Sequence, residues 1–556
     1  MKRIIALLLT VLLLATACAG CRKVYTDGSN VEIISVEDAK AEMTALLSNV
    51  KVTNITAPID ISDNEYTEAD SLADISTFPL TVTGSGEINI EIAADTELSS
   101  EAPDDWMVVL ARQFNAQGNT YNGKTVTVSV RQITGGEVVT YMRAGKYRPD
   151  LYVPSHGAWG KMLDASGIGT VTLCDRLLGN TAGILMSDKV YDGFIEKYGE
   201  ITMKNVVEAT LAGDINFAYT NPYSSSTGLN MLTMILKAFD PANPLSQTAA
   251  DKLNVYQRTS PPTAHTTAVM RNKAAKGIID TMVMEEQAYV LTPSLSSYIY
   301  VPLGIRHDHP VFSFDYVSQE KQEAAKLFID YCLTDKAQKL GYEKGFNRHE
   351  EYQGDDPGLD GNGYLAAQKL WKENKTGGLP VIALFVADVS DSMRGTPLKS
   401  LKSALLSASP YIGDDNYVGL ISYSRDIMIN LPIGRFDEMQ RAKFSGAVKN
   451  LSTYGRTATY DAVLEGMKLL LEKQEEIPEA RAIMILLTDG AQNEGVSYSR
   501  IASIVKAFGI PVYTIAYYMT TPEELREMAE LNEADAANAS NADIVNKLRD
   551  LFNSEL

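Results

Sequence analysis

Hydrophobic positions along this chain form short runs of strand length, and segments of helical periodicity separate them. The alternation is clearest near the C-terminus, with apolar runs at 381–387, 418–423, 482–487 and 512–517 and helical patterns at 400–408, 461–473 and 497–507. Runs that are apolar on both faces are typical of parallel strands that helices cover on both sides. The pattern therefore predicts a doubly wound, mainly parallel α/β sheet in this part of the chain.

The middle of the chain repeats this alternation with different spacings. Strands are expected at 88–93, 125–131, 150–155 (with a polar tip) and 215–219, and helices at 106–115, 137–144 and from 229 onward. Sites in open α/β sheets lie at the carboxyl ends of the strands. We therefore look for binding residues in the polar loops that follow these strands.

Shifts in composition divide the chain into five parts. We expect a signal peptide at 1–21, an acidic tether at 22–83 with one amphipathic helix at 36–47, a two-lobed domain at 84–350, a linker rich in Gly and Asp at 351–379, and a C-terminal domain at 380–556. The sizes of the two folded parts suit two lobes and one lobe, respectively.

The first residues have the pattern of an export signal. Lys2 and Arg3 precede an apolar run at 4–14, which is shorter than the about 20 residues that a membrane-spanning helix requires. Small residues before Cys18 and Cys21 resemble the bacterial lipobox, whose cysteine is lipidated after cleavage. The resemblance implies an extracytoplasmic protein anchored to the cell membrane through lipid on Cys21 or, alternatively, on Cys18. An ordinary signal peptide is the simpler alternative.

Charge and cysteine content narrow the classes of partner. The 556 residues include 70 acidic and 50 basic side chains, and the formal net charge of -20 repels nucleic-acid phosphates and anionic membrane surfaces. Hydrophobic residues at 45% and charged residues at 22% are typical of soluble globular protein. Beyond the leader the cysteines are Cys174 and Cys332, which either pair or stay buried as thiols.

Polar residues with short side chains follow the C-terminal strands. Asp388, Ser390 and Ser392 come after one strand, Asp489 after another, and Thr457 precedes a helix. Alternation in an extended loop places the first three side chains on one side. Two carboxylates and three hydroxyls, without His or Cys, form an oxygen-rich site that suits Mg²⁺, with Mn²⁺ or Ca²⁺ as alternatives. Capping of helices by Ser and Asp is the structural alternative.

The order Asp-x-Ser-x-Ser, Thr and Thr-Asp-Gly resembles the metal-ion-dependent adhesion site (MIDAS) of von Willebrand factor A (VWA) domains. The resemblance covers the C-terminal domain. It implies that the three hydroxyls are metal ligands, that the two carboxylates act directly or through water, and that an acidic group of a protein partner completes the coordination.

One residue departs from the family pattern, which usually has a second glycine where this chain has Arg456. An arginine there either crowds the rim or recognises an acidic partner. Hydrolysis at this site is disfavoured, because metal-assisted catalysis requires a general base and the C-terminal domain contains no histidine. We therefore expect a binding protein and not an enzyme.

Loops of the middle domain carry a second set of polar residues. Hydroxyls and free backbone N–H groups at a helix N-terminus bind anions or polar ligands, although capping alone is an equal alternative. The candidate ligand-binding residues are the loop side chains Thr96, Ser99, Ser100, Ser155, His156, Thr220, Asn221, Ser224, Ser226 and Thr227.

The order of elements, the polar turn before the helix and a closing stretch at 324–346 resemble a bacterial type II extracellular solute-binding protein. The resemblance implies two α/β lobes around a cleft, crossover strands near 182–186 and 298–303, and a small polar solute held by the loops named above. His307 and His309 form a His-x-His pair without further ligands, which we interpret as loop surface and not as a metal site.

Two functions follow from these resemblances. The first is a cell-envelope lipoprotein that binds a divalent metal at the MIDAS for protein–protein interaction or adhesion, with the solute-binding-like domain as sensor or scaffold. The alternative is the substrate-binding component of an ABC-type transporter for a small polar or anionic solute, with the VWA domain as tether. The fold does not choose the solute, because related clefts bind oxyanions, sugars and peptides.

Overall fold

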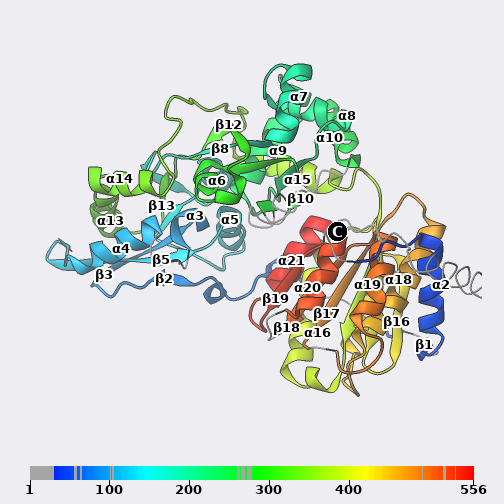
Figure 1. Cartoon of the computed structure of the whole chain (residues 1–556). Helices are drawn as coiled ribbons and strands as arrows, with labels where there is room; N and C mark the ends of the chain where they lie inside the picture. The colour runs from blue at the N-terminus through cyan, green and yellow to red at the C-terminus, as the bar shows by residue number, and fades with distance from the viewer. Residues whose placement is uncertain are drawn as a thin grey trace, which may run out of the picture. The chain divides into compact units, whose positions relative to one another are not determined.

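A computed structural model describes residues 31–556, apart from the stretches 55–58, 63–65, 101, 103–104, 260–262, 265–269, 272–273, 275–278, 491, 518–520 and 533. The expected signal peptide and both candidate lipidation sites, Cys18 and Cys21, lie outside the described residues. The chain divides into two compact units (Figure 1). Unit 1 comprises Met1–Tyr66 and Pro380–Lys547, and unit 2 comprises Thr67–Leu379 and Leu548–Leu556.

Unit 1 is built on a mainly parallel sheet with the strand order β1-β16-β15-β14-β17-β18-β19. Its strands are β1 (Val52–Asn54), β14 (Val381–Asp388), β15 (Tyr417–Tyr423), β16 (Ile427–Arg435), β17 (Arg481–Thr488), β18 (Val512–Tyr517) and β19 (Ala536–Ala539). The central strand β14 is buried along its whole length and pairs in parallel with β15 and β17, whereas β16 runs antiparallel to β15.

Apolar side chains on both faces of β14 explain why helices cover the sheet on both sides. Leu384 and Val386 belong to a core cluster that also contains Met467 of α18, whereas Phe385 contacts Phe444 of α17 with ring centroids 5.5 Å apart. The helices are α2 (Val36–Leu47), α16 (Thr396–Ala408), α17 (Glu438–Lys449), α18 (Thr459–Glu476), α19 (Tyr498–Phe508) and α20 (Glu523–Leu531). The last helix of the chain, α21 (Ile544–Glu555), begins in unit 1, and most of its residues belong to unit 2. The doubly wound α/β fold predicted for this region is confirmed.

Part of the expected tether belongs to the folded core of unit 1. The helix α2 buries Ala39 and Met43 against α18 and α19, and β1 adds a parallel edge strand beside β16. The structure therefore differs from a tether spanning 22–83. The physical reason is that one apolar helix face is enough to dock this segment, although the sequence around it is acidic and polar.

Met43 provides a test of this docking, since its side chain is 5% exposed. Met43→Ala is expected to lower the free energy of unfolding of unit 1 by about 2–5 kcal/mol, because it removes buried atoms and leaves a cavity. Glu42→Ala, at an exposed position of the same helix, should change it by less than about 0.5 kcal/mol. Scanning calorimetry measures both variants, and equal transitions would contradict the docking of α2.

Unit 2 contains two sheets, each of which forms the core of a lobe. Lobe A has the strand order β2-β5-β3-β6-β13-β7 with β4 beside β5, and lobe B has the order β10-β9-β11-β8-β12. The strands are β2 (Leu80–Val82), β3 (Ile88–Ala94), β4 (Thr120–Tyr121), β5 (Lys124–Gln132), β6 (Leu151–Val153), β7 (Thr170–Cys174), β8 (Thr181–Ser187), β9 (Phe217–Thr220), β10 (Thr263–Ala264), β11 (Thr281–Glu285), β12 (Tyr298–Arg306) and β13 (Val311–Phe314).

The chain passes between the lobes through β8 and β12, which pair antiparallel at the edge of lobe B. β8 follows β7 of lobe A, and β12 leads into β13 of lobe A. These are the crossover strands that the sequence predicted near 182–186 and 298–303. Because both connections meet side by side, the loops at the tips of the two sheets are brought to face each other.

Helices surround both lobes of unit 2 (Figure 1). They are α3 (Thr96–Ser99), α4 (Trp106–Ala116), α5 (Gly135–Arg143), α6 (Ala158–Ala165), α7 (Asp188–Tyr198), α8 (Met203–Ala212), α9 (Ser226–Phe239), α10 (Gln247–Arg258), α12 (Glu286–Val290), α13 (Gln319–Cys332), α14 (Asp335–Glu343) and α15 (Gly361–Asn374). The helix expected from residue 229 begins at Ser226, because the Ser225 hydroxyl accepts the Gly228 N–H at 3.3 Å and caps it.

The expected linker at 351–379 contains the helix α15, which packs into unit 2. Ala367 and Trp371 are fully buried in the core of lobe B, and the Trp371 indole N–H donates to the Tyr219 hydroxyl at 2.9 Å. The glycine-rich flanks suggested a flexible connection. The structure differs because α15 has an apolar face, on which Tyr364, Ala367 and Trp371 are buried at helical spacing.

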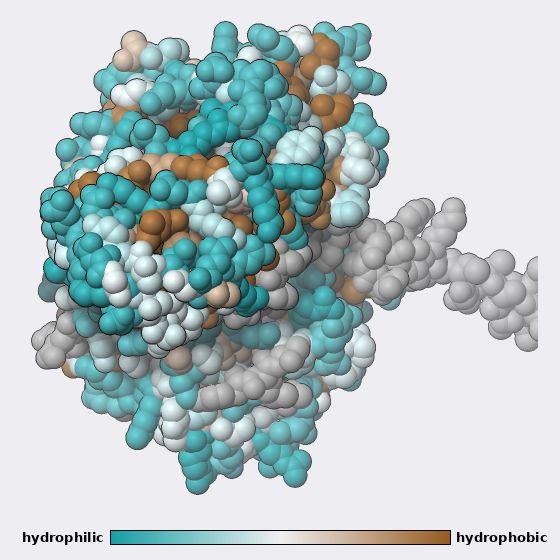
Figure 2. Space-filling view, turned by 90° about the vertical axis from the view of Figure 1, so that its left-hand side faces the viewer, coloured by the Kyte–Doolittle hydropathy of each residue, from teal (hydrophilic) through white to brown (hydrophobic). Residues whose placement is uncertain are grey.

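Hydrophobic residues on the face shown in Figure 2 occur in groups that hydrophilic residues separate. In the part of the chain that the structure describes, no helix combines the length and the apolar character needed to cross a membrane. Cys174 is half-buried and Cys332 is buried, and both are free thiols.

Candidate functional site

The loop after β14 builds one side of the candidate metal site in unit 1. Asp388 ends β14 and is fully buried. One of its carboxylate oxygens accepts the Ser390 N–H at 2.8 Å, and the other accepts the Thr488 hydroxyl at 2.8 Å. Because Thr488 ends the neighbouring parallel strand β17, the carboxylate is oriented from two strands at once.

Side-chain oxygens continue from this anchor as a connected chain. Ser390 Oγ lies 2.9 Å from Ser392 Oγ, and the Ser392 hydroxyl donates to Asp489 Oδ1 at 2.8 Å. Neighbouring ligands of an octahedral Mg²⁺ ion lie about 2.9 Å apart, because each metal–oxygen bond is about 2.1 Å long. The spacing of these oxygens fits that geometry.

A third loop joins the first two. The Asp391 N–H donates to the Gly455 carbonyl at 3.0 Å, and the Tyr454 N–H donates to the Val389 carbonyl at 2.8 Å. Thr457 follows in this loop, and its side chain is buried. The structure therefore brings together the three loops that carry the five expected ligands.

The chemistry of the donor set fits a hard divalent cation. Burial raises the pKa of Asp388 to about 6, and burial also raises the pKa of Asp489. Among the described residues, no group of three or more His, Cys, Asp or Glu is placed to hold a metal ion. A site here therefore depends on hydroxyl oxygens together with two carboxylates, which suits Mg²⁺ or Ca²⁺ and not Zn²⁺. Arg456 is exposed beside it.

Sequence reasoning missed the side chains that hold the Thr457 loop and the loop after β17. Asn493 Oδ1 accepts the Thr457 N–H at 3.0 Å, and Asp461 Oδ1 accepts the Val496 N–H at 2.9 Å. The polar run after Thr-Asp-Gly was the available signal for Asn493. Asp461 has no local signal, because its partner lies 35 residues further along the chain.

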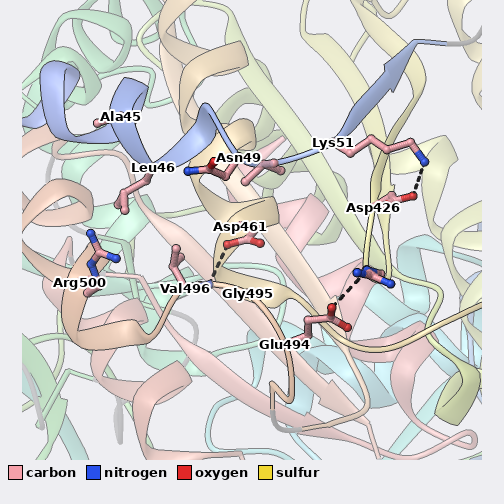
Figure 3. A pocket seen from close by; sticks show the side chains of 12 residues that line it. Ala45, Leu46, Asn49, Lys51, Asp426, Asp461, Glu494, Gly495, Val496 and Arg500 are labelled. Atoms are coloured by element: carbon pink, nitrogen blue, oxygen red, sulfur yellow. Dashed lines mark hydrogen bonds and ion pairs between the residues drawn. The ribbon is translucent and has the colours of Figure 1, made fainter.

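A pocket of about 770 Å³ borders these loops within unit 1 (Figure 3). The segment after α2 forms one wall, where Lys51 pairs with Asp426 at 2.6 Å. On another wall Arg425 pairs with Glu494 at 3.2 Å. The Glu494 N–H donates to the Thr457 carbonyl at 3.2 Å, so this wall contacts a candidate ligand directly.

In unit 2 the expected ligand-binding residues fall into two groups. Ser155, His156, Ser226 and Thr227 are buried where the loops of the two lobes meet. The remaining six stabilise local turns or lie beside them. Three of them donate hydrogen bonds: the Thr96 N–H to Asp95, the Ser99 hydroxyl to the Ala94 and Asp95 carbonyls, and the Thr220 hydroxyl to Ser225. Ser100 accepts from the Ala102 N–H, Asn221 accepts from the Tyr223 N–H, and the Ser224 hydroxyl is buried without a hydrogen-bond partner.

The buried group converges on Asp95, which sequence reasoning missed. Asp95 directly follows β3 and is 4% exposed. Its Oδ2 atom accepts the Ser155 hydroxyl at 2.8 Å and the Ser226 hydroxyl at 3.2 Å. Ser155 belongs to lobe A and Ser226 to lobe B, so the Asp95 carboxylate connects the two lobes.

The interpretation of His307 and His309 as loop surface is wrong, because both side chains are fully buried. His309 Nε2 lies 3.2 Å from Glu97 Oε1, and His307 Nδ1 lies 3.6 Å from Glu285 Oε1. The two histidines follow the crossover strand β12 directly. A segment that passes between two lobes is covered from both sides, which residue type alone does not reveal.

Burial and ion pairing set the charges of this cluster. Burial raises the pKa values of Asp95 and Glu285 to about 7 each and lowers that of His156 to about 4. Burial also opposes ionisation of Glu97 and His309. Their hydrogen bond and mutual attraction outweigh it, lowering the pKa of Glu97 and raising that of His309.

Raising the pH from 6 to 9 is therefore expected to destabilise unit 2. The folded pKa of Asp95, about 7, lies above its ordinary value of 3.8, so its protonation stabilises the fold. That contribution is complete below about pH 4 and is lost as the pH rises through 7. Glu285 and His309 act in the same direction because their pKa values are also raised. His156, whose pKa is lowered to about 4, and His307, whose pKa burial also lowers, act in the opposite direction as the pH rises through 6.5, but they are two groups against three.

Tryptophan fluorescence during urea unfolding measures this effect, because the three tryptophans of the chain, Trp106, Trp159 and Trp371, all lie in unit 2. The urea midpoint should fall between pH 6 and pH 9. Asp95→Asn, which has no carboxyl group to ionise, should show a smaller fall. An equal fall in both proteins would contradict the role assigned to Asp95.

Comparison with known families agrees with this architecture. Residues 98–347 match the family model described as bacterial extracellular solute-binding protein, and residues 384–554 match that of the von Willebrand factor type A domain. The chain therefore combines a solute-binding-protein region with a C-terminal VWA domain. The two-part architecture predicted from the sequence is confirmed.

Individual relatives resemble only parts of the chain. A segment of 129 residues is 36% identical to inter-alpha-trypsin inhibitor heavy chain H3 of Bos taurus, covering 22% of this chain and 14% of that protein. The chain thus spans about one seventh of that relative's length. A von Willebrand factor type A structure from Catenulispora acidiphila matches with a TM-score of 0.29 and 20% identity, over 32% of this chain and 42% of that chain. The sulfate-binding protein SubI of Mycobacterium tuberculosis matches with a TM-score of 0.34 and 17% identity, over 47% of this chain and 86% of that chain.

Proposed function

We propose that this protein is a cell-envelope lipoprotein whose VWA domain binds a divalent metal ion and uses it to dock an acidic group of a partner protein. The solute-binding-like domain serves as scaffold or sensor. The observation that carries the proposal is the connected chain of oxygens from Ser390 through Ser392 to Asp489, spaced 2.8–2.9 Å apart beside the buried Asp388.

The residues of the rim have separate roles in this proposal. A bound cation supplies positive charge and an open coordination position for an outside carboxylate. Asp388 and Asp489 provide the negative charge that holds the cation. Ser390, Ser392 and Thr457 provide neutral hydroxyl oxygens, so the cation keeps its attraction for a further anionic group. We favour Mg²⁺, with Mn²⁺ or Ca²⁺ as alternatives.

Binding, and not catalysis, is the role that the sequence supports. The two matched families indicate no catalytic activity. The VWA domain contains no histidine to serve as a general base. Rim arginines such as Arg456, exposed next to Thr457, would favour a partner that carries more than one acidic group.

Calorimetry with MgCl₂ tests the metal site. The wild-type protein is expected to bind Mg²⁺ and Asp388→Ala to lose binding, because the variant removes the carboxylate that orients Ser390. At a metal concentration 100-fold above the dissociation constant, Mg²⁺ should stabilise wild-type unit 1 by about 2.7 kcal/mol and the variant by nothing measurable.

Asp391→Ala is the matched control for this experiment. Asp391 lies between two proposed ligands, is exposed and pairs with Arg394. Its substitution removes the same charge from the same loop and should leave Mg²⁺ binding intact. Equal binding by wild type and Asp388→Ala, or equal loss in both variants, would refute the proposed ligand set.

The cellular location is the second part of the proposal. The match to an extracellular solute-binding family supports an extracytoplasmic location. The lipid anchor is inferred from the lipobox-like residues before Cys21, with Cys18 as the alternative. The membrane would then be contacted through the lipid, and nucleic acid is not a partner of so acidic a chain.

Metabolic labelling with a clickable palmitate analogue tests the anchor. Wild type and Cys18→Ser should incorporate the label, and Cys21→Ser should not, because only the lipidated cysteine becomes the new N-terminus. The opposite pattern would move the anchor to Cys18. Absence of label from the wild-type protein would contradict the lipoprotein assignment.

A second candidate function rests on the family match of residues 98–347. It is the substrate-binding component of an ABC-type transporter for a small polar or anionic solute, with the VWA domain as tether. This function predicts that natively purified protein retains a solute, which native mass spectrometry would detect. The contacts between the two lobes of unit 2 weigh against the anionic form of this function.

A further inference from the structure

The hydroxyl groups that an anionic solute would use are already engaged where the loops of the two lobes of unit 2 meet. Asp95 Oδ2 accepts the Ser155 hydroxyl at 2.8 Å and the Ser155 N–H at 3.3 Å. Ser226, the first residue of α9 in the opposite lobe, donates to the same oxygen at 3.2 Å. The carboxylate of the protein itself thus occupies the position that these converging donors offer to an anion.

Ser226 is in turn held by side chains of lobe A. The Trp159 indole N–H donates to Ser226 Oγ at 2.8 Å, and His156 Nε2 lies 3.1 Å from the Ser226 carbonyl oxygen. Trp159, His156, Ser226 and Asp95 are all at most 5% exposed. Because water is excluded from these contacts, each is stronger than on the surface and costly to break without a replacement.

One proton is shared at the centre of this cluster. The Ser155 hydroxyl contacts both Asp95 and Glu97. A hydroxyl has a single hydrogen to donate, so one of the two carboxyl groups must be protonated to satisfy the other contact. Asp95 and Glu97 therefore share one proton, and the pair keeps one negative charge, as a bound anion would.

Thr227 and Glu285 repeat the arrangement in lobe B. The Thr227 hydroxyl donates to Glu285, whose Oε1 atom lies 3.6 Å from His307 Nδ1. The hydroxyls of Ser155, Ser226 and Thr227 therefore all have internal carboxylate partners. An incoming oxyanion would have to displace those partners and would face their negative charge.

Contacts away from the cluster also join the two lobes. Gly136 of lobe A lies so close to lobe B that a Cβ atom there would be 1.9 Å from the Tyr223 carbonyl oxygen. The helix α15 contacts both lobes: a Cβ atom at Gly361 would be 1.9 Å from the Lys161 carbonyl oxygen of lobe A, and Gln368 Nε2 donates to the Pro222 carbonyl of lobe B at 2.8 Å. Separating the lobes would break the contact of Gly136 with lobe B, and it would also break the contacts of α15 with one of the two lobes.

We propose that Asp95 is a built-in substitute for a bound anion. It fills the anion position between Ser155 and Ser226 and holds the lobes together, so the native protein takes up no oxyanion there. Removal of the Asp95 side chain turns this position into a binding site for a small carboxylate. The proposal does not depend on metal binding in unit 1, and it makes the solute-binding-like domain a scaffold instead of an anion sensor.

Asp95→Gly in the full chain tests the proposal, with formate as the probe. Urea unfolding followed by tryptophan fluorescence reports unit 2. The variant should unfold at a lower urea concentration than wild type. Sodium formate should restore the midpoint in a saturable manner, with a dissociation constant of about 1 mM or weaker for so small a ligand. Sodium chloride at equal ionic strength should not restore it.

Asp105→Gly is the matched control. The Asp105 carboxylate accepts the Ser100 N–H at 2.9 Å in the same lobe, at the half-buried start of α4. This variant also loses a carboxylate that binds a backbone N–H, but formate should not restore its stability. Equal restoration of both variants would show a general salt effect and would overturn the proposal.

The native protein supplies a second measurement that does not depend on the folding of any variant. Calorimetric titration of wild type with sodium sulfate and with sodium formate should show no saturable binding, and tryptophan emission should stay unchanged. Saturable binding of either anion to wild type would overturn the proposal. So would a folded Asp95→Gly protein that formate does not stabilise.

Discussion

The carboxyl ends of parallel strands meet at one edge of a sheet, and the candidate metal site depends on this constraint. β14 and β17 are neighbours in unit 1, so Asp388 at the end of one strand meets Thr488 at the end of the other. Asp489 is the next residue after Thr488 and is thereby placed beside Ser392. Ser392 and Asp489 are 97 positions apart in sequence, and the pairing of the two strands alone brings them to hydrogen-bonding distance.

The same side-chain chemistry has opposite outcomes in the two units. In unit 1 the connected hydroxyls of Ser390 and Ser392 reach the surface at Ser392, which is exposed, whereas Ser390 beside it is buried. In unit 2 the hydroxyls of Ser155 and Ser226 are buried and already bonded to Asp95. The exposure of Ser392 makes the difference, because a buried hydroxyl must find an internal partner whereas an exposed one can exchange water for a ligand.

Local patterns were sufficient to predict much of this structure, and long-range packing explains the remainder. The apolar runs around Asp388 have the length of buried strands, and the polar turn before Ser226 is typical of a helix start. The sheet and the loops could therefore be located from sequence. Asp95 could not, since its partners lie 60 and 131 residues away. His307 and His309 were misjudged because only the crossover topology covers them. Met43 and Trp371 were hidden in polar segments, where one apolar side chain is a weak local signal but a large contribution to packing.

Diffraction at the manganese absorption edge from crystals soaked in MnCl₂ tests the central claim most directly. Mn²⁺ takes the same oxygen ligands as Mg²⁺ and can be located by its anomalous signal. The account predicts an anomalous peak within about 2.5 Å of the hydroxyls of Ser390 and Ser392. A peak only elsewhere in the protein, or the Arg456 guanidinium in place of the ion, would contradict it.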